Sequence, residues 1–342
     1  MKIKKVLFIF LSFIIVITLL SPLAGLVAYN KLFSRTERPN YELTPGLIDY
    51  SIVNSNNDYS RELYSINSNK ETLQGYYYPV ENSQAMIVMS HGINDGADSL
   101  LPQIMYFIDK GYTVFSYDGT GCYSSSGKSS NGFSQSLIDL ENVLHFLDST
   151  PTFASQKKLL FGYSWGGYAS TSIFNLDTNN VYGSVSISGY YNAKNLLYNK
   201  GKSYVGPLAT LGKPFLDILL ESRFKDYLSY DAIAGINNTS LPIYIIHGEK
   251  DATITYNNLS IISQKDRITN PNVIYQTILN KGHVTLMYSN DSIEYRKKVD
   301  KELKELKKKE HKAYIAQVDD VLYSQIDKEL FDNIDLFYKN CL

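Results

Sequence analysis

The chain has 342 residues, of which 44% are hydrophobic and 20% are charged, and its formal net charge is −1. This length is enough for one large domain or two small ones with a sizeable core, and the composition is that of an ordinary globular protein. The near-neutral charge gives no field that would attract nucleic acid, so we expect no nucleic-acid partner. The two cysteines, Cys122 and Cys341, lack metal-ligand spacing.

The amino terminus predicts a single-pass membrane anchor over residues 1–33. Three lysines among the first five residues precede a stretch without charged side chains, from Val6 through Asn30. A helix needs about 20 apolar residues to cross the hydrocarbon core, so this stretch is long enough. The alternative is a cleaved signal peptide, whose apolar region is usually shorter and for which a good cleavage site is missing here. The lysines at the start favour an extracytoplasmic position for the rest of the chain, outside the cell membrane.

After a polar linker over residues 34–45, the sequence predicts one domain over residues 46–342 in which strands alternate with helices. Amphipathic helices are expected at 100–111 and 136–149. Strands are expected at 73–80, 85–92, 112–119, 157–162, 181–189, 241–248 and 272–278. This alternation favours an α/β fold with a mostly parallel central sheet and helices on both faces.

The alternation lapses over residues 190–240, where glycines and prolines separate short helical segments. This insertion lies between two predicted strands. Irregular packing is one explanation, but long connections in α/β domains tend to carry function. We therefore expect a small helical lid over a binding cleft.

A helical extension is expected over residues 291–342. Its first part is densely charged, and acidic and basic residues four positions apart, such as Asp300 and Lys304, support an exposed helix. We expect a solvated helix docked along one edge of the domain. The alternative is a basic surface that touches anionic lipid beside the anchor. The last residues, 330–342, predict an amphipathic helix.

The stretch KKLLFGYSWGGYAS, residues 157–170, contains the strongest chemical signal in the chain. A predicted strand runs into a turn with glycines two residues on either side of Ser164. The G-x-S-x-G pattern between a strand and a helix is typical of a nucleophile elbow, in which the glycines allow a tight turn and the serine hydroxyl projects from the sheet. We predict that Ser164 is a nucleophile.

A serine nucleophile needs a base that takes its proton, and in this architecture the base follows the serine in the chain. Three histidines follow Ser164. His247 ends a predicted strand, and His311 lies in the charged helix. His283 follows the last predicted strand in a glycine-containing loop, where it can reach the carboxyl edge of the sheet. We predict that His283 is the base.

An acid must orient this base, and it should follow the preceding strand. The stretch IIHGEKDATI offers two carboxylates, Glu249 and Asp251. We predict that Asp251 accepts a hydrogen bond from one imidazole nitrogen of His283, with Glu249 as the alternative.

The reaction also needs an oxyanion hole made of main-chain donors. One donor is expected to be the N–H of Trp165, directly after the nucleophile, and the other the N–H of Ile93, in the loop that follows an earlier strand. Gly92 allows close approach of the backbone there, and His91 is expected to brace the loop. No metal or cofactor is needed for this chemistry.

Four features stand in the order that a known superfamily shows: SHG, then YDGTGCYSSSG, then GYSWGG, and then HGEKD followed by GH. Together they resemble the α/β-hydrolase superfamily over roughly residues 70–290. They resemble more closely bacterial membrane-anchored hydrolases grouped with the serine aminopeptidase S33-like and dienelactone hydrolase-like proteins. One departure is GTGCYSSSG, which is longer than the usual G-x-G-x-S-x-G.

This resemblance implies the α/β-hydrolase fold and matches Ser164, Asp251 and His283 to nucleophile, acid and base. It does not specify the substrate, because the superfamily includes esterases, lipases, thioesterases and peptidases. We expect a membrane-anchored serine hydrolase that cleaves a small acyl ester through an acyl-enzyme. The alternatives are a non-catalytic surface binding module and a peptidase of aminopeptidase type. A peptidase would hold the substrate ammonium with an acid, for which the lid offers Asp217, Glu221, Asp226 and Asp231.

Overall fold

The computed structural model describes residues 25–55, 58–206 and 209–342. The greater part of the expected anchor, residues 1–24, therefore lies outside the described residues. The part of it that is described, residues 25–32, is helical. Within the described ranges, none of the helices combines the length and the apolar character that crossing a membrane requires.

The described residues form an eight-stranded sheet with strand order β1-β2-β4-β3-β5-β6-β7-β8. Strand β2 runs antiparallel to both of its neighbours, and the strands from β4 to β8 pair in parallel. The strands are β1 Glu62–Ser68, β2 Glu71–Tyr78, β3 Met86–Ser90, β4 Thr113–Tyr117, β5 Lys158–Tyr163, β6 Val181–Ile187, β7 Ile243–Gly248 and β8 Val273–Ile278. The mostly parallel sheet expected from the alternation is therefore confirmed.

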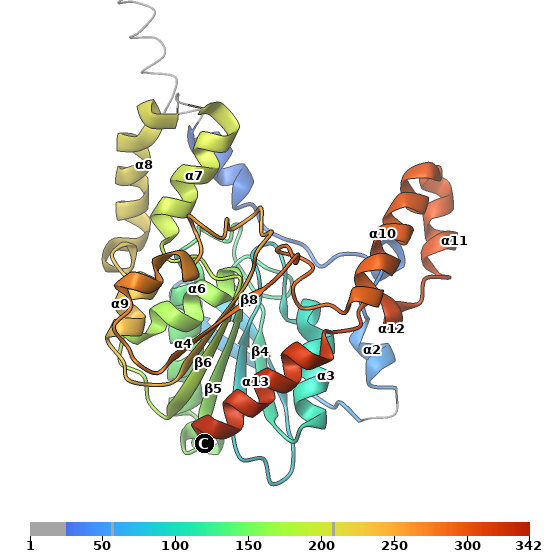
Figure 1. Ribbon diagram of the computed structural model, residues 1–342, viewed down its shortest axis with the longest axis horizontal. Helices are drawn as coiled ribbons and strands as arrows, with labels where there is room; N and C mark the ends of the chain where they lie inside the picture. Colours follow the sequence, from blue (N-terminus) through green and yellow to red (C-terminus); the bar gives the residue numbers. More distant parts are fainter. Residues whose placement is uncertain (1–24, 56–57, 207–208) are drawn as a thin grey trace, which may run out of the picture.

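Helices cover both faces of the sheet (Figure 1). On one face lie α4 Gln135–Ser149, α6 Trp165–Ser172 and α9 Ala232–Asn237, and on the other lie α3 Leu101–Asp109 and α13 Lys328–Cys341. The strands supply alternate side chains to the two cores. In β5, Leu160 packs with the α4 and α6 side, whereas Leu159 and Phe161 pack with the α3 and α13 side.

The insertion expected over residues 190–240 contains two long helices, α7 Ala193–Val205 and α8 Ala209–Phe224, followed by α9. Helices α7 and α8 stand side by side at one end of the molecule (Figure 1). They are longer than the short helical segments expected from the sequence. The prolines and glycines do not divide them further, and Pro214 lies inside α8.

Residues 34–45, expected to be a polar linker, are attached to the domain. Thr36 forms a β-bridge with Cys122. The Arg35 guanidinium donates hydrogen bonds to three main-chain carbonyls of the loop after β4, those of Tyr123, Ser125 and Gly127. The side chain of Phe33 is fully buried. The packed domain thus begins before residue 46, because this segment pairs with the loop instead of running through solvent.

The carboxyl-terminal extension has two parts. The helices α10 Asn290–Glu305, α11 His311–Ile315 and α12 Asp320–Tyr323 form an arm that projects beside the sheet (Figure 1). Among the described residues, the ion pair between neighbouring turns of α10 joins Lys298 to Glu302, at 4.0 Å, rather than Asp300 to Lys304. The arm contacts an amino-terminal segment, where Lys312 pairs with Glu42 at 2.6 Å. The helix that returns to the sheet is α13.

Two further α-helices are short, α2 Tyr50–Val53 and α5 Pro151–Ala154. Helix α2 lies near the arm in Figure 1, and α5 follows α4 after a single residue. Strand β1 and helix α2 were not expected from the sequence.

Candidate active site

Ser164 lies at the junction of β5 and α6 with backbone angles φ 54° and ψ −103°. Such a conformation costs a non-glycine residue on the order of 1–3 kcal/mol, so the surrounding structure has to hold it in place. Two main-chain hydrogen bonds do so. The N–H of Ser164 donates to the carbonyl of Ile187 at 2.8 Å, and the N–H of Tyr168 donates to the carbonyl of Ser164 at 3.1 Å. The strained turn presents the serine side chain at the carboxyl end of the sheet.

The two glycines that flank Ser164 make this turn sterically possible. A Cβ atom on Gly162 would lie 2.1 Å from the carbonyl oxygen of Gly166, and one on Gly166 would lie 2.1 Å from the carbonyl oxygen of Ser90. Both neighbours are backbone atoms, which cannot move without shifting a strand or the helix. The glycine spacing of the motif therefore has a direct steric reason at each position.

Replacing Gly166 by alanine is expected to abolish turnover and to lower the free energy of unfolding by about 3 kcal/mol, because the new methyl group collides with β3. Urea unfolding and ester turnover measure the two effects. Gly212→Ala in α8 is the matched control, because a Cβ atom there has no neighbour within 4 Å. This control is expected to keep activity, and a variant at Gly166 with normal turnover would contradict the steric account.

Three predicted residues meet in one hydrogen-bonded chain. His283 Nε2 lies 2.8 Å from Ser164 Oγ, and His283 Nδ1 lies 2.6 Å from Asp251 Oδ2. The other carboxylate oxygen of Asp251 accepts hydrogen bonds from the main-chain N–H groups of Thr253 and Ile254, each at 2.8 Å. With Oδ1 held by these donors, Oδ2 is left to orient the imidazole. In this network Nδ1 carries the proton and Nε2 can accept the proton of the serine hydroxyl.

The Asp251 carboxyl is buried, and burial by itself would raise its pKa. Hydrogen bonds from His247 and His283 outweigh that effect and hold the pKa well below its usual range. Asp251 is therefore ionised at neutral pH. Glu249, the alternative acid, is exposed, and its carboxylate accepts a hydrogen bond from the main-chain N–H of Asn280 at 3.2 Å.

His247 is a neighbour of the acid that sequence reasoning did not assign to the site. Its Nε2 lies 2.8 Å from the carbonyl oxygen of Ile254 and 3.2 Å from Asp251 Oδ2. The carbonyl accepts, so Nε2 carries the proton, and the same N–H also points to the carboxylate. The signal in the sequence is the spacing, because a histidine at the end of a buried strand lies four residues before the acid.

The two expected oxyanion donors lie on neighbouring segments. Trp165 is the first residue of α6, and Ile93 lies in the loop after β3. Among the described residues, neither main-chain N–H has a protein acceptor. The N–H of Gly166 donates to the carbonyl of His91 at 3.1 Å and ties the two segments together. Unpaired N–H groups at the start of a helix stabilise a negative charge placed next to them, such as the one that develops on a carbonyl oxygen during acyl transfer.

His91 braces the loop that carries Ile93. Its Nε2 accepts a hydrogen bond from the main-chain N–H of Gly119 at 2.8 Å, so the proton is on Nδ1, which donates to the carbonyl of Gly92 at 2.6 Å. The side chain is fully buried, and burial lowers its pKa. Both nitrogens are therefore engaged in a structural contact, as expected from the sequence.

Known proteins are similar to this chain over the region that contains the loop after β3 and the start of α6. The family described as serine aminopeptidase, S33, matches residues 81–232. The esterase Pf2001 of Pyrococcus furiosus has the same fold, with a TM-score of 0.55 and 17% identity over 80% of this chain and 98% of its own. The chain has the α/β-hydrolase fold, and its residues 81–232 are similar to the serine aminopeptidase S33 family.

Two further similarities come from other organisms. Est1E of Butyrivibrio proteoclasticus, solved with ferulic acid bound, has a TM-score of 0.51 and 13% identity over 70% of this chain and 97% of its own. The polyketide transferase af380 of Aspergillus fumigatus is 30% identical over 108 residues, which are 31% of this chain and 37% of its own. The chain spans about a third of the length of the curated relatives it matches.

Tyr163, the residue before Ser164, lies beside the imidazole of His283. Its ring centroid is 5.4 Å from that of His283, and its hydroxyl donates to the carbonyl of His283 at 3.2 Å. The same tyrosine ring and the carboxylate of Asp95 enclose Gly92, since a Cβ atom there would lie 3.2 Å and 3.3 Å from them. Asp95 therefore lies in the loop of the expected oxyanion donor, a carboxyl that sequence reasoning did not single out.

Burial raises the pKa of Asp95 to about 7. Because the folded pKa lies above the unfolded value of about 3.9, the protein loses stability as the pH rises from about 4 to about 7. Asp95→Asn removes this loss. The free energy of unfolding of the variant is expected to equal that of the wild type near pH 4 and to exceed it by about 1–2 kcal/mol at pH 8. The difference is small because partial exposure of Asp95 weakens the penalty of burying its ionised carboxylate.

Urea unfolding at several pH values measures this difference, with the exposed Glu81→Gln as control. An Asp95→Asn variant whose advantage is the same at pH 4 and pH 8 would contradict the titration.

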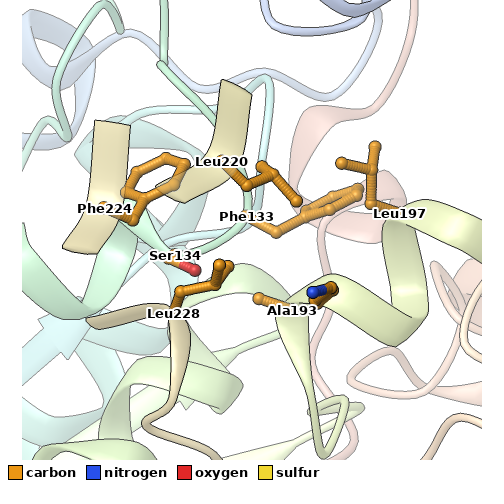
Figure 2. A pocket seen from close by; sticks show the side chains of 8 residues that line it. Phe133, Ser134, Ala193, Leu197, Leu220, Phe224 and Leu228 are labelled. Carbon is orange, nitrogen blue, oxygen red and sulfur yellow. The ribbon is translucent and has the colours of Figure 1, made fainter. Parts of the chain in front are cut away.

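A small apolar pocket lies between the lid and the domain (Figure 2), with a cavity volume of about 10 Å³. Its walls come from α7, α8, the 3-10 helix Lys225–Leu228 after α8, and the loop before α4: Phe133, Ser134, Ala193, Lys194, Leu197, Leu220, Phe224 and Leu228. The carbonyl of Phe133 accepts a hydrogen bond from the Trp165 indole N–H at 3.0 Å. One wall of the pocket is thus bonded to the residue that follows Ser164.

None of the four lid acids expected to hold a substrate ammonium lines this pocket. Asp217 pairs with Lys194 at 2.7 Å. Asp231 caps α9 by accepting a hydrogen bond from the N–H of Ala234 at 2.8 Å. These two acids already have structural partners, and the pocket that the lid covers is apolar.

Proposed function

We propose that this α/β-hydrolase cleaves acyl esters by serine nucleophilic catalysis. The observation that carries the proposal is the continuous hydrogen-bonded chain from Asp251 through His283 to Ser164, at 2.6 Å and 2.8 Å. A serine, a neutral imidazole and a carboxylate in this order are the groups that acyl transfer requires.

In the first half-reaction, Ser164 Oγ attacks the carbonyl carbon of the ester while its proton moves to His283 Nε2. The carbonyl electron pair moves to the oxygen, which the N–H groups of Ile93 and Trp165 are proposed to hold. Collapse of this intermediate breaks the ester C–O bond, and the imidazolium gives its proton to the leaving alcohol. In the second half-reaction, His283 takes a proton from water, which attacks the acyl carbon. The bond between that carbon and Ser164 Oγ then breaks, the imidazolium returns its proton to Oγ, and the acid is released.

The apolar pocket supports an acyl chain as the group on the acid side of the ester. Its lining is dominated by aromatic and aliphatic side chains, and the carbonyl of one lining residue, Phe133, accepts a hydrogen bond from the indole N–H of Trp165. Removing apolar surface from water contributes about 0.8 kcal/mol for each buried methylene group, so such a pocket favours hydrocarbon over a charged group.

A fluorophosphonate probe tests the proposal, because it forms a stable bond only with an activated serine. We expect labelling of the native protein and none after heat denaturation, with the label mapped by mass spectrometry to the peptide that contains Ser164. Labelling that is absent from well-folded protein would refute the mechanism and favour a non-catalytic binding module on the same fold.

One observation favours a second candidate, a serine peptidase of aminopeptidase type. Asp95 lies near Gly92 and Tyr163 without a hydrogen-bond or ion-pair partner among the described residues, and a carboxylate there could hold a substrate ammonium. Comparing short acyl p-nitrophenyl esters with aminoacyl p-nitroanilides separates the two candidates. The peptidase requires faster turnover of the anilides, and a selective loss of that turnover in Asp95→Asn.

We also propose that the chain is anchored in the cell membrane by its amino-terminal apolar stretch, with the domain outside the cytoplasm. The charge-free sequence from Val6 to Asn30 and the preceding lysines support it. Protease added to intact cells should cut the domain. Protection in intact cells together with cleavage in lysed cells would overturn the orientation, and recovery in the soluble fraction would overturn the anchor.

A further inference from the structure

Helix α8 is apolar on two opposite faces. One face packs on the domain through Leu216, Leu220 and Phe224. On the other face, Leu211, Phe215 and Ile218 follow each other at spacings of four and three residues and are 47%, 42% and 69% exposed. At 100° per residue these three side chains fall within one narrow arc, directly opposite the packed face. A surface helix normally has a polar outer face, so this stripe needs an explanation.

Two neighbouring segments extend the apolar stripe. The helical segment 25–32 lies beside α7 and α8 at the same end of the molecule (Figure 1), and the Arg223 guanidinium of α8 lies 4.8 Å above the Tyr29 ring. Val27 of this segment is exposed, and so is Tyr204 near the end of α7. We call these five residues, Val27, Tyr204, Leu211, Phe215 and Ile218, the lid-end surface.

We propose that the lid-end surface lies on a lipid bilayer. This inference goes beyond ester hydrolysis and rests on the proposed anchor. The described chain begins at Gly25 at this end, and the preceding residues belong to the charge-free stretch that starts at Val6. A bilayer that holds this stretch is therefore the apolar phase that lies nearest to the stripe on α8.

Charge near the lid-end surface fits anionic headgroups. Helices α7 and α8 carry five basic side chains and two acidic ones: Lys194, Lys200, Lys202, Lys213 and Arg223 against Asp217 and Glu221. Each basic group near an anionic membrane contributes about 1 kcal/mol, so the basic side chains of α7 and α8 favour contact with an anionic bilayer.

This arrangement orients the pocket toward the bilayer. Leu220 and Phe224 line the pocket from the packed face of α8, while the lid-end surface occupies its outer face. A single helix thus separates the bilayer from the pocket. We infer that the favoured substrates are esters dissolved in the membrane, whose acyl chains pass directly from lipid to the pocket.

The test uses the full chain reconstituted into phosphatidylcholine vesicles, with and without phosphatidylglycerol. An environment-sensitive fluorophore is attached to Ile218→Cys in a Cys341→Ser background, since Cys122 is buried. Val321→Cys is the matched control, because Val321 is also an exposed apolar residue but lies in the arm. We expect a blue shift and quenching by a lipid-attached quencher at 218, stronger with phosphatidylglycerol, and neither at 321.

A protein that is inserted in the vesicles but shows no quenching at 218 overturns the proposal. A blue shift that depends on protein concentration and not on lipid also overturns it, and points to a second copy of the chain as the occupant. Failure of the proposed anchor is a different result, because the protein would not float with the vesicles. Failure of the proposed hydrolysis is detected independently by fluorophosphonate labelling.

A second variant tests the consequence for substrates. Leu211→Ser, Phe215→Ser and Ile218→Ser together change only outward-facing side chains and leave the pocket lining intact. Turnover of a long-chain ester in vesicles is expected to fall about tenfold, whereas turnover of a soluble short-chain ester stays unchanged. Equal loss on both substrates would refute the role of this surface in substrate delivery.

Discussion

Replacing Ser164 by alanine is expected to lower kcat for ester hydrolysis by about 10⁶-fold, with little change in the free energy of unfolding. The Oγ atom is the proposed site of the covalent bond, and no other group can supply it from that position. The hydroxyl makes one described hydrogen bond, to His283 at 2.8 Å, so its loss removes little packing. Steady-state turnover and urea unfolding of the same preparations measure the two quantities.

The chain offers a close control in Ser188→Ala. Ser188 is also a buried serine with a positive φ, 52°, directly after a strand, and its hydroxyl has no hydrogen-bond partner among the described residues. Turnover of this control is expected to stay within about threefold of wild type. Comparable loss in both variants would mean that the effect comes from the fold, and full activity in Ser164→Ala would require a different nucleophile.

Asp251→Asn is expected to lower kcat by about 10⁴-fold, while Glu249→Gln stays near wild type. The carboxylate accepts hydrogen bonds on both oxygens, and an amide nitrogen in either position would face a donor. With the nitrogen toward His283, the imidazole would have to turn its proton to Nε2 and could no longer accept the proton of Ser164. Turnover of both variants between pH 5 and pH 9 measures the effect.

The lowered pKa of Asp251 also predicts how acid affects the fold. Its folded pKa lies below the unfolded value of about 3.9, so the stabilisation is complete above that value and is lost as the pH falls through the folded pKa. Asp251→Asn should therefore flatten the acid limb of the unfolding profile. An unchanged acid limb would show that the carboxylate is not held by its histidine donors, and a large effect of Glu249→Gln on kcat would transfer the acid role to that residue.

The parallel core and the group of candidate residues could be predicted because their signals are local. Each inner strand is a short apolar run that stops at a glycine or a serine, and the fold brings the carboxyl ends of such strands to one edge. Knowing the strand ends was enough to expect Ser164, Asp251 and His283 near each other, and their measured separations agree with that expectation. Their catalytic roles remain proposals.

Features that depend on pairing between distant segments could not be predicted in this way. Strand β1, sequence ELYSINS, has few apolar residues because it lies at the sheet edge with most of its side chains in solvent. The charged sequence of the arm formed by α10 to α12 predicts exposed helices. It does not predict whether they dock on the sheet or project from it, because both positions leave the charged side chains in solvent. The raised pKa of Asp95 depends on the burial that its neighbours impose, which no local pattern encodes.

The stretch GTGCYSSSG illustrates both cases. Its extra length relative to the usual superfamily pattern was visible in the sequence, but its purpose was not. In the structure this loop exposes carbonyls that accept the hydrogen bonds of Arg35, and Cys122 pairs with Thr36. The added residues therefore form the surface to which the segment after the apolar stretch is attached.

Because the segment after the apolar stretch is attached to this loop, few free residues separate the proposed anchor from the domain. The chain is already bound to the domain at Tyr29, inside the charge-free stretch, where the buried tyrosine hydroxyl donates a hydrogen bond to the carbonyl of Asn131, and the attachment continues at Phe33 and Arg35. A long flexible tether lets a domain move over a range of distances from the bilayer, and that range grows with the length of the tether. A tether of only a few residues, each about 3.5 Å long at most, fixes both the height of the domain above the bilayer and its tilt. The enzyme would then sample substrate by lateral diffusion in two dimensions, so its rate would depend on the surface density of ester in the leaflet and not on the bulk concentration.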